Sequence, residues 1–463
     1  MPRRLVRLAV YLFAPILKPV LKATVGRHKG LWRRLQKTRD SLFRGAPMDE
    51  GLEAPLSKRL AAARAELVRP SNRGRDSSLA PEQRRPFGVN VAGFFRSEKG
   101  LGESARSYVR SLEAAGIPYV LNNVDDFGSE NPATDHDNFS SSSPYAVNLV
   151  CLNADEAINF ALHKGRRYFE NKHNIGIWLW ELADLPEEWA SAFQYYDELW
   201  VSSTFVARAI SRVSPIPVYV VPHSIDLTDR APASIERSQF GLSPDSFVFL
   251  FMFDFQSSIE RKNPLGLIEA FRQAFPENDE VALLIKSSHG DFDPDGFRRL
   301  GKAADRANVK LIDKVLSREE VTGLFQLCDC YISLHRSEGF GLTLAEAMYA
   351  EKSVIATAFG GNVDFMTETN SYLVRYRLIE IEEDHGPYKK GGVWADPDLQ
   401  HAAALMRSVY LNPDEARSLG RIARSEITAC QHPSVVGRLI RERLAGRGLP
   451  KDLAIPKPGG NSE

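Results

Sequence analysis

Two glutamates around a glycine-rich turn are the residues of this sequence best suited to chemistry. Glu338 and Glu346 are separated by seven residues, and Gly339 and Gly341 lie between them. An apolar run that predicts a β-strand ends just before Glu338, and a helical pattern begins just after Gly341. Glycines let backbone N–H groups approach a ligand, and a helix N-terminus adds unpaired donors with a partial positive charge. The pattern predicts a diphosphate site in which the two carboxylates accept hydrogen bonds from sugar hydroxyls.

The spacing leaves a purely structural alternative open for Glu346. The segment Thr343-Leu-Ala-Glu346 matches a capping box, in which the glutamate side chain only bonds the backbone at the helix start. Glu338 precedes the helix and has no comparable structural role. The functional interpretation therefore depends more on Glu338 than on Glu346.

The elements that must position this turn can be predicted from residue 86 onward, where short apolar runs alternate with helical patterns. Runs that are apolar throughout, and that helices separate, predict parallel sheets covered on both faces. Two such sets predict two doubly wound α/β domains that bind ligands at the carboxyl ends of their strands. The expected strands are Phe87–Phe95, Tyr119–Val124, Ala146–Leu152, Asn174–Trp180, Glu198–Ser202, Val218–Pro222, Phe247–Asp254, Val281–Ser287, Val309–Asp313, Cys330–His335, Ser353–Ala358 and Ser371–Val374. The expected helices include Glu103–Ala115, Leu185–Tyr196, Thr204–Val213, Pro264–Phe275, Pro294–Arg306, Arg318–Leu327 and Thr343–Ala350, and Asp398–Arg447 is helical in pattern.

The length of 463 residues exceeds what one hydrophobic core usually serves, so more than one domain is expected. The expected divisions are a basic extension and linker at 1–85, an α/β domain at 86–227, a second at 228–428, and a C-terminal helix with a disordered tail at 429–463.

The overall composition excludes several classes of protein. Hydrophobic residues make up 43% and charged residues 25%, which is ordinary for a soluble chain and excludes wholesale disorder and a polytopic membrane protein. Lys and Arg total 59, as do Asp and Glu, so the chain lacks the basic excess of a general nucleic-acid binder and no nucleic-acid partner is expected. Four scattered cysteines do not form a disulfide scaffold, which favours a reducing, cytoplasmic compartment.

The N-terminal segment is very different from the chain as a whole. Residues 1–40 hold eleven Lys and Arg residues against Asp40 alone, around the apolar stretch Leu8–Leu17, which is too short to span a bilayer. One interpretation is an interfacial anchor that places the protein on the anionic inner face of the plasma membrane. A cleaved signal peptide and a disordered basic arm are the alternatives.

Taken together, these motifs resemble a known family. Glu338-x7-Glu346 with its Gly-Phe-Gly resembles the signature of retaining glycosyltransferases of the GT-B fold, the group 1 or family 4 class. The resemblance covers roughly residues 87–439. It is supported by Val221–Asp226, similar to the interdomain Pro-Asn-Gly-Val-Asp element, by Arg261–Pro264, and by Gly360-Gly361-Asn362. The sequence looks closest to bacterial polysaccharide-assembly members. The fold class implied is two Rossmann-like domains that face a cleft.

The resemblance also implies roles for particular residues. The second domain would bind a nucleotide-sugar donor and the first an acceptor. Glu346 would hold the ribose hydroxyls and Glu338 the donor sugar, while Lys262, helped by Arg261, would neutralise the diphosphate. A solvated helix start is the alternative for the two basic residues. Backbone groups that would lie against the sugar and phosphates belong to Gly339, Phe340, Gly341 and Leu342, and to the first-domain loop with Gly100 and Gly102, which could equally be a plain strand-to-helix turn.

Two departures from the family pattern leave roles open. The arginine that usually precedes the lysine is absent from Phe255–Ser258, so Arg261 or Arg336 could substitute for it. Trp180 and Glu181 stand where relatives often carry a histidine that points into the cleft. Trp180 could stack on a sugar or simply pack in the core, and Glu181 is a speculative acceptor-side base.

The resemblance implies a hexosyltransferase that retains anomeric configuration, with no protein nucleophile and no metal or other cofactor. The nucleotide sugar, GDP- or UDP-linked, would be a substrate, and the acceptor would be a glycan or a lipid-linked glycan in bacterial polysaccharide biosynthesis. The alternatives are a nucleotide-sugar epimerase, a phosphorylase, or a non-catalytic transferase-like partner subunit. An epimerase would turn over the donor without any acceptor.

Overall fold

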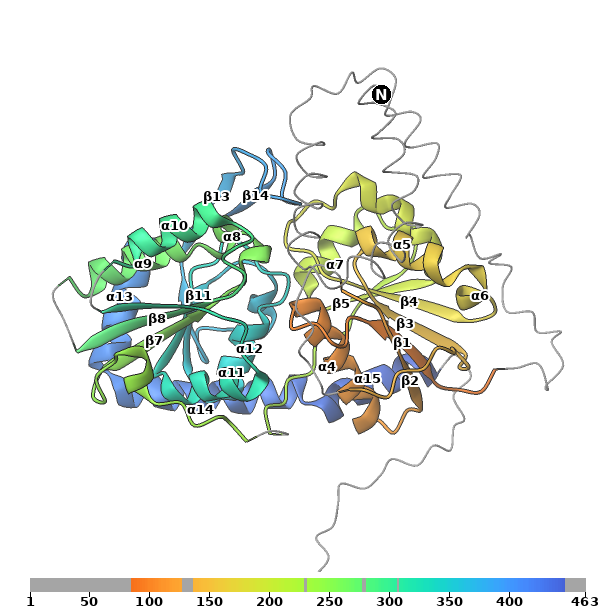
Figure 1. Ribbon diagram of the computed structural model, residues 1–463, viewed down its shortest axis with the longest axis horizontal. Helices are drawn as coiled ribbons and strands as arrows, with labels where there is room; N and C mark the ends of the chain where they lie inside the picture. Colours follow the sequence, from red (N-terminus) through yellow and green to blue (C-terminus); the bar gives the residue numbers. More distant parts are fainter. Residues whose placement is uncertain (1–84, 127–135, 229–230, 277–279, 306–307, 446–463) are drawn as a thin grey trace, which may run out of the picture. The chain divides into compact units, whose positions relative to one another are not determined.

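The computed structural model describes residues 85–126, 136–228, 231–276, 280–305 and 308–445 (Figure 1). All of these residues belong to one compact unit, residues 67–463. The predicted anchor in residues 1–40 and the C-terminal tail lie outside the described residues.

The first lobe is a six-stranded parallel sheet in the order β2-β1-β3-β4-β5-β6. Its side chains alternate between two apolar clusters, as the period of two in a strand requires. Val89 and Val91 face α4 and α15, whereas Val150 and Trp178 face α5, α6, η2 and α7. The strands are β1 (Val89–Gly93), β2 (Tyr119–Asn123), β3 (Val147–Cys151), β4 (His173–Trp178), β5 (Glu198–Val201) and β6 (Val218–Val220). The helices are α4 (Gly100–Ala114), α5 (Ala154–Lys164), α6 (Arg166–Phe169), the 3-10 helix η2 (Glu187–Tyr195), α7 (Thr204–Ser211) and, from the end of the chain, α15 (Pro433–Ala445).

The second lobe repeats this plan with the parallel order β12-β11-β10-β7-β8-β9. Phe249 and Phe251 pack against α9, α10 and α13, and Val248 and Leu250 pack against α11, α12 and α14 on the opposite face (Figure 1). The strands are β7 (Phe247–Met252), β8 (Val281–Ser287), β9 (Val309–Asp313), β10 (Cys330–Ser333), β11 (Ser353–Thr357) and β12 (Tyr372–Val374). The helices are η3 (Arg237–Phe240), η4 (Phe255–Ser257), α8 (Ile259–Lys262), α9 (Pro264–Ala274), α10 (Pro294–Ala303), α11 (Arg318–Leu327), α12 (Leu342–Tyr349), η5 (Gly361–Asp364), α13 (Leu399–Leu411) and α14 (Pro413–Gln431).

All twelve predicted strands are present, and the predicted fold class of two Rossmann-like α/β domains is confirmed. The structure adds an antiparallel hairpin of β13 (Tyr376–Glu380) and β14 (Val393–Pro397), which the sequence did not indicate because β13 is mostly exposed. The predicted helix Leu185–Tyr196 is a 3-10 helix. The helical C-terminal pattern is three helices, and the last of them, α15, packs on α4 of the first lobe rather than on the second lobe that precedes it in sequence.

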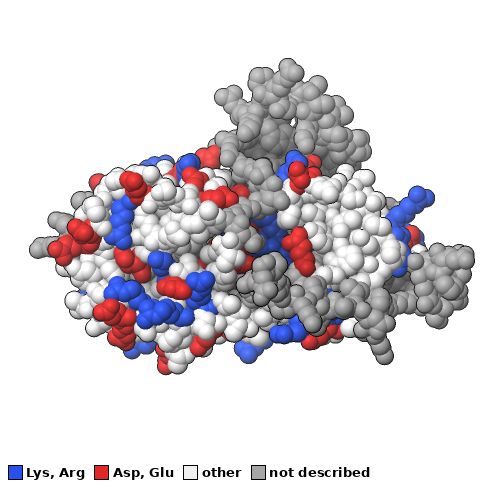
Figure 2. All heavy atoms as spheres, turned by 90° about the horizontal axis from the view of Figure 1, so that it is seen from below, with Lys and Arg blue, Asp and Glu red and all other residues white. Residues whose placement is uncertain are grey.

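The charge distribution on the surface and the character of the described helices complete the description of the fold. On the face seen in Figure 2, Lys and Arg lie interspersed with Asp and Glu rather than gathered in one basic patch. Among the described residues, no helix combines the length and the apolar character needed to cross a bilayer.

Candidate functional site

The glycine-rich turn lies at the carboxyl end of β10, where the sequence places it. It leads into α12, whose N-cap residue is Gly341 with a left-handed backbone at φ 93°. A side chain at Gly339 would bring a Cβ within 2.5 Å of the Trp180 carbonyl oxygen of the first lobe. The Gly339 carbonyl in turn accepts a hydrogen bond from Ser203 Oγ at 2.6 Å. The turn therefore passes directly against the first lobe, and glycine is needed for that approach.

Three predicted site residues, Glu338, Lys262 and Arg261, meet although they lie far apart in the sequence. Lys262 Nζ donates a hydrogen bond to Glu338 Oε1, and Arg261 Nη1 lies 3.4 Å from Glu338 Oε2. Burial raises the pKa of Glu338, but the charges of Lys262 and Arg261 outweigh it and bring that pKa from its ordinary value of 4.5 to about 2. Burial lowers the pKa of Lys262, and Glu338 opposes that shift. The cluster therefore contains an ionised carboxylate beside two cations at the start of the glycine turn.

Arg261 is not a solvated residue at a helix start, so that alternative is wrong for this residue. Its side chain is 3% exposed and donates to the backbone carbonyls of Ser257 at 3.1 Å and Ser337 at 2.8 Å. Its guanidinium also lies 5.4 Å from the centre of the Tyr388 ring. Because the guanidinium is fixed by these contacts, Arg261 holds the loop that carries Glu338.

The capping-box alternative for Glu346 is also wrong. The N-cap of α12 is Gly341, which makes no side-chain cap, and Thr343 Oγ1 accepts a hydrogen bond from Tyr331 at 2.8 Å. Glu346 is 2% exposed and accepts a hydrogen bond from Arg318 Nη2 at 2.6 Å. Burial raises the pKa of Glu346, and Arg318 opposes the shift. Glu346 therefore makes a side-chain contact one turn into the helix, which a cap role does not explain.

The first-lobe glycines have different environments. A Cβ at Gly102 would overlap the Ser97 carbonyl oxygen and lie 2.8 Å from the Phe94 carbonyl oxygen, so close packing explains this residue. Gly100, the first residue of α4, has open space where a Cβ would lie. Glu103 follows Gly102 in α4, and its Oε1 lies 3.8 Å from Arg318 Nη2 of the second lobe. The start of α4 therefore faces the Glu346 side of the glycine turn.

The structure corrects the assignment of Trp180 to sugar stacking. Its side chain is 2% exposed, its ring packs edge-on against Trp189 at 5.0 Å, and its indole N–H donates to the Asp184 carbonyl at 2.8 Å. Two tryptophans at a spacing of two residues are here core residues of β4 and its extension. Glu181, by contrast, accepts a hydrogen bond at Oε2 from Tyr388 at 3.0 Å, and its charge acts on both Arg261 and Lys262.

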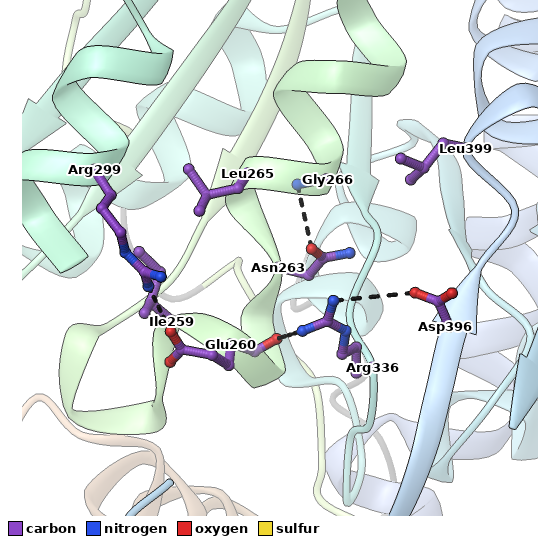
Figure 3. A pocket seen from close by; sticks show the side chains of 9 residues that line it. All are labelled: Ile259, Glu260, Asn263, Leu265, Gly266, Arg299, Arg336, Asp396 and Leu399. Atoms are coloured by element: carbon purple, nitrogen blue, oxygen red, sulfur yellow. Dashed lines mark hydrogen bonds and ion pairs between the residues drawn. The ribbon is translucent and has the colours of Figure 1, made fainter. Parts of the chain in front are cut away.

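Arg336, the other residue suggested in place of the absent arginine, contacts a different set of residues from Glu338. It donates to the Glu260 carbonyl at 3.1 Å and lies 4.0 Å from Asp396. Figure 3 shows it between these two residues in a pocket of about 290 Å³. The pocket is lined by Ile259, Glu260, Asn263, Leu265, Gly266, Arg299, Arg336, Asp396 and Leu399.

Sequence reasoning missed Tyr388, Arg318 and Glu103. Tyr388 lies in the loop of the hairpin that no periodicity indicated, and Arg318 carries no motif. Glu103 could have been predicted as a site residue, because it directly follows the Gly100–Gly102 loop in the sequence.

The turn after β11 supports the glycine turn, which leads to a prediction about stability. A Cβ at Gly361 would overlap the Gly339 carbonyl oxygen and lie 2.7 Å from Ser203 Oγ, while the Gly361 N–H donates to the Glu338 carbonyl at 2.7 Å. Gly361→Ala is therefore expected to lower the free energy of unfolding by about 1–3 kcal/mol, measured by urea denaturation. Gly301→Ala is the matched control, because an added Cβ meets nothing within 4 Å there. It should raise stability by up to about 1 kcal/mol, and equal effects of the two changes would contradict the packing argument.

Comparisons with known proteins relate the second lobe to a family. Residues 234–426 match the family model described as "Glycosyl transferases group 1". Trehalose synthase of Rubrobacter xylanophilus is 27% identical over 221 residues, 46% of each chain. Trehalose synthase of Thermococcus litoralis is 29% identical over 106 residues, 22% of this chain and 26% of its own length. The matches span less than half the length of these curated relatives.

Solved structures agree on the fold over most of the chain. Sucrose-phosphate synthase of Thermosynechococcus elongatus has a TM-score of 0.59 at 17% identity, covering 78% of this chain and 100% of its own. A glycosyltransferase of Rickettsia africae has a TM-score of 0.55 at 15% identity, covering 77% and 97%. HepE of Anabaena, solved in complex with UDP-glucose, has a TM-score of 0.54 at 15% identity, covering 78% and 100%. Together, these comparisons show that the two lobes have the GT-B fold and that residues 234–426 match the group 1 glycosyl transferases.

Proposed function

We propose that this chain is a retaining glycosyltransferase that moves a hexose from a nucleotide sugar to a glycan or lipid-linked acceptor in bacterial polysaccharide biosynthesis. The observation that carries the proposal is the meeting of Lys262 and Glu338 at the start of the glycine turn, with buried Glu346 one turn into the helix that follows. The proposal needs no metal or other cofactor, as the resemblance to the family implies.

The donor is proposed to be a UDP- or GDP-sugar. HepE of Anabaena, which shares the fold, was solved with UDP-glucose bound, and this supports a nucleotide sugar for the present chain. In this proposal the ribose hydroxyls bind Glu346, a hydroxyl of the donor sugar binds Glu338, and the diphosphate lies against Gly339–Leu342.

The chemistry assigned to these residues is stabilisation of the leaving group. A departing nucleoside diphosphate gains negative charge in the transition state, and fixed cations and N–H dipoles lower the barrier by stabilising it. In this proposal, Lys262 and the N-terminus of α12 supply this stabilisation. No side chain is proposed as a nucleophile, and the leaving phosphate is proposed to take the proton of the acceptor hydroxyl.

Glu181 is proposed as the carboxylate on the acceptor side of the site. This carboxylate comes from the first lobe, and its charge acts on Lys262 and Arg261 of the second lobe, which supports a role beside the proposed donor site. Tyr388 orients it through the hydrogen bond to Oε2. An epimerase or a phosphorylase would share the two-domain cleft. An epimerase would turn over the donor without any acceptor, and a non-catalytic subunit would need none of these residues.

Nucleotide binding tests the proposal. The purified chain is screened by thermal shift against UDP, GDP, ADP and dTDP. A nucleotide at 100 times its Kd stabilises the folded state by about 2.7 kcal/mol, so at least one is expected to raise the Tm by a few degrees. The corresponding free nucleosides serve as controls for the diphosphate. A Tm unchanged by all four nucleotides would contradict the proposed function.

Membrane contact through residues 1–40 stays a prediction. It rests on the eleven basic residues and the apolar stretch Leu8–Leu17, all of which lie outside the described residues. Deletion of residues 1–40 should release the protein from membranes in cell fractionation and leave nucleotide binding intact.

A further inference from the structure

A buried ion cluster joins the two lobes beside the glycine turn. Arg318 Nη2 lies 2.6 Å from Glu346 Oε1 and 3.8 Å from Glu103 Oε1. Glu103 belongs to α4 of the first lobe, whereas Arg318 and Glu346 belong to α11 and α12 of the second lobe. Glu103 is 4% and Glu346 is 2% exposed. One guanidinium is therefore shared between two buried carboxylates from opposite lobes.

The cap of α11 does not explain an arginine at this position. The start of α11 is already closed by a capping box between Ser317 and Glu320, so the Arg318 side chain is not needed there. Glu103 also has Arg106 Nε at 3.0 Å and Arg110 Nη2 at 2.6 Å. A buried ion pair contributes little net stability, because desolvation offsets much of the attraction, but removing one partner is destabilising because it leaves a buried charge unpaired.

The position of the guanidinium points to a phosphate. Glu346 lies four residues after Leu342, the first residue of α12, which is about one helix turn or roughly 6 Å along the axis. The guanidinium therefore contacts a residue about one turn from the N-terminus of α12, the end at which backbone N–H groups and the helix dipole favour a phosphate. Of the two arginines that the sequence suggested as a second cation, Arg261 is fixed by backbone carbonyls and Tyr388, and Arg336 lies between Glu260 and Asp396.

We propose that Arg318 is a second diphosphate-binding cation of the donor site, an inference that rests on the proposed function. In this structure Glu346 and Glu103 hold its guanidinium. When the ribose hydroxyls engage Glu346, the planar fork of N–H donors turns to the nearest phosphate oxygens, which it fits better than a lysine would. Glu103 competes with the phosphate for the same guanidinium.

The experiment is a calorimetric titration of the full chain and three variants with UDP and with uridine, or with GDP and guanosine if GDP is the nucleotide that the wild type binds. Arg318→Gln is expected to weaken UDP binding by at least about tenfold, because a charged hydrogen bond is lost, and uridine binding by less than about threefold. Arg318→Lys, which keeps the charge without the fork, should fall between the wild type and Arg318→Gln for UDP only. Glu103→Gln removes the competing negative charge and should not weaken UDP binding.

Three results would overturn the inference. The first is an unchanged UDP affinity in Arg318→Gln, and the second is an equal loss for UDP and uridine, which would mean that Arg318 acts only by positioning Glu346. The third is a weakening by Glu103→Gln as large as that by Arg318→Gln, which would make the cluster a structural brace. If Arg318→Gln does not fold, Arg318→Lys is compared with Glu103→Gln by the same criteria. A wild-type chain that binds none of the nucleotides would instead overturn the proposed function and this inference with it.

Discussion

Replacing Lys262 with methionine is expected to slow release of the nucleoside diphosphate from a nucleotide sugar by roughly 100- to 1,000-fold. Methionine has a similar length but no charge, so the variant loses the cation that would stabilise the departing diphosphate. The rate is measured with the nucleotide sugar whose nucleotide gives the largest thermal shift. Lys302→Met, on the exposed side of α10, is the control and should leave the rate unchanged. A rate in Lys262→Met within threefold of the wild type would contradict the role of Lys262.

The pH dependence of stability gives this variant a second readout. The pKa of Glu338 falls from 4.5 to about 2 in the folded protein, so its ionisation stabilises the fold above pH 4.5 and this contribution is lost as the pH falls to about 2. Lys262 causes much of that shift. Lys262→Met should therefore be destabilised most at neutral pH, and the difference in unfolding free energy from the wild type should shrink as the pH falls below 4.5. Urea denaturation at several pH values measures this difference.

Replacing Glu346 with alanine is expected to raise the Kd for the bound nucleotide by roughly 10- to 100-fold. A carboxylate that accepts hydrogen bonds from ribose hydroxyls contributes about 1.5–3 kcal/mol through each charged hydrogen bond, and about 1.4 kcal/mol is a factor of ten in Kd. Calorimetric titration with UDP or GDP measures the change. Glu269→Ala, an exposed glutamate of α9, is the matched control and should bind as the wild type does.

The outcome also distinguishes a binding role of Glu346 from a structural one. The variant leaves Arg318 with Glu103 as its remaining partner in the cluster, so some loss of stability is expected with either role. A lowered Tm with an unchanged Kd would show that Glu346 only supports the fold. A raised Kd at a temperature where the variant is fully folded supports the ribose role.

The strands were predictable from the sequence because parallel strands buried on both faces are apolar throughout. Phe247–Met252 is such a run, and Val147–Cys151 is apolar except for the buried Asn148; both strands lie at the centre of their sheets. The hairpin of β13 and β14 was not predictable in the same way, since its residues Tyr376 and Leu378 are exposed and follow no core pattern. The loop between its two strands nevertheless carries Tyr388 into the core beside Arg261 and Trp180.

The site was predictable only where its residues are close in sequence or match a known pattern. The glycine turn is local, so its strand, its left-handed glycine and its helix could be read from one segment. Only the resemblance to the family associated Lys262 with the glycine turn. No local rule connects Arg318 with Glu103, because their contact depends on how the two lobes face each other. The role of Trp180 could not be predicted from the sequence. A buried aromatic and a sugar-stacking aromatic look the same in sequence, and only packing distinguishes them.

The turn from Arg336 to Leu342 is proposed to bind an activated sugar through its nucleotide. The most direct test is a crystal structure of the full chain with UDP or GDP, whichever raises the Tm more. We expect the ribose hydroxyls to lie within hydrogen-bond distance of Glu346 and the diphosphate to lie between Lys262 and the N-terminus of α12. A nucleotide bound elsewhere, with the contacts of Lys262 to Glu338 and of Arg318 to Glu346 unchanged, would contradict it.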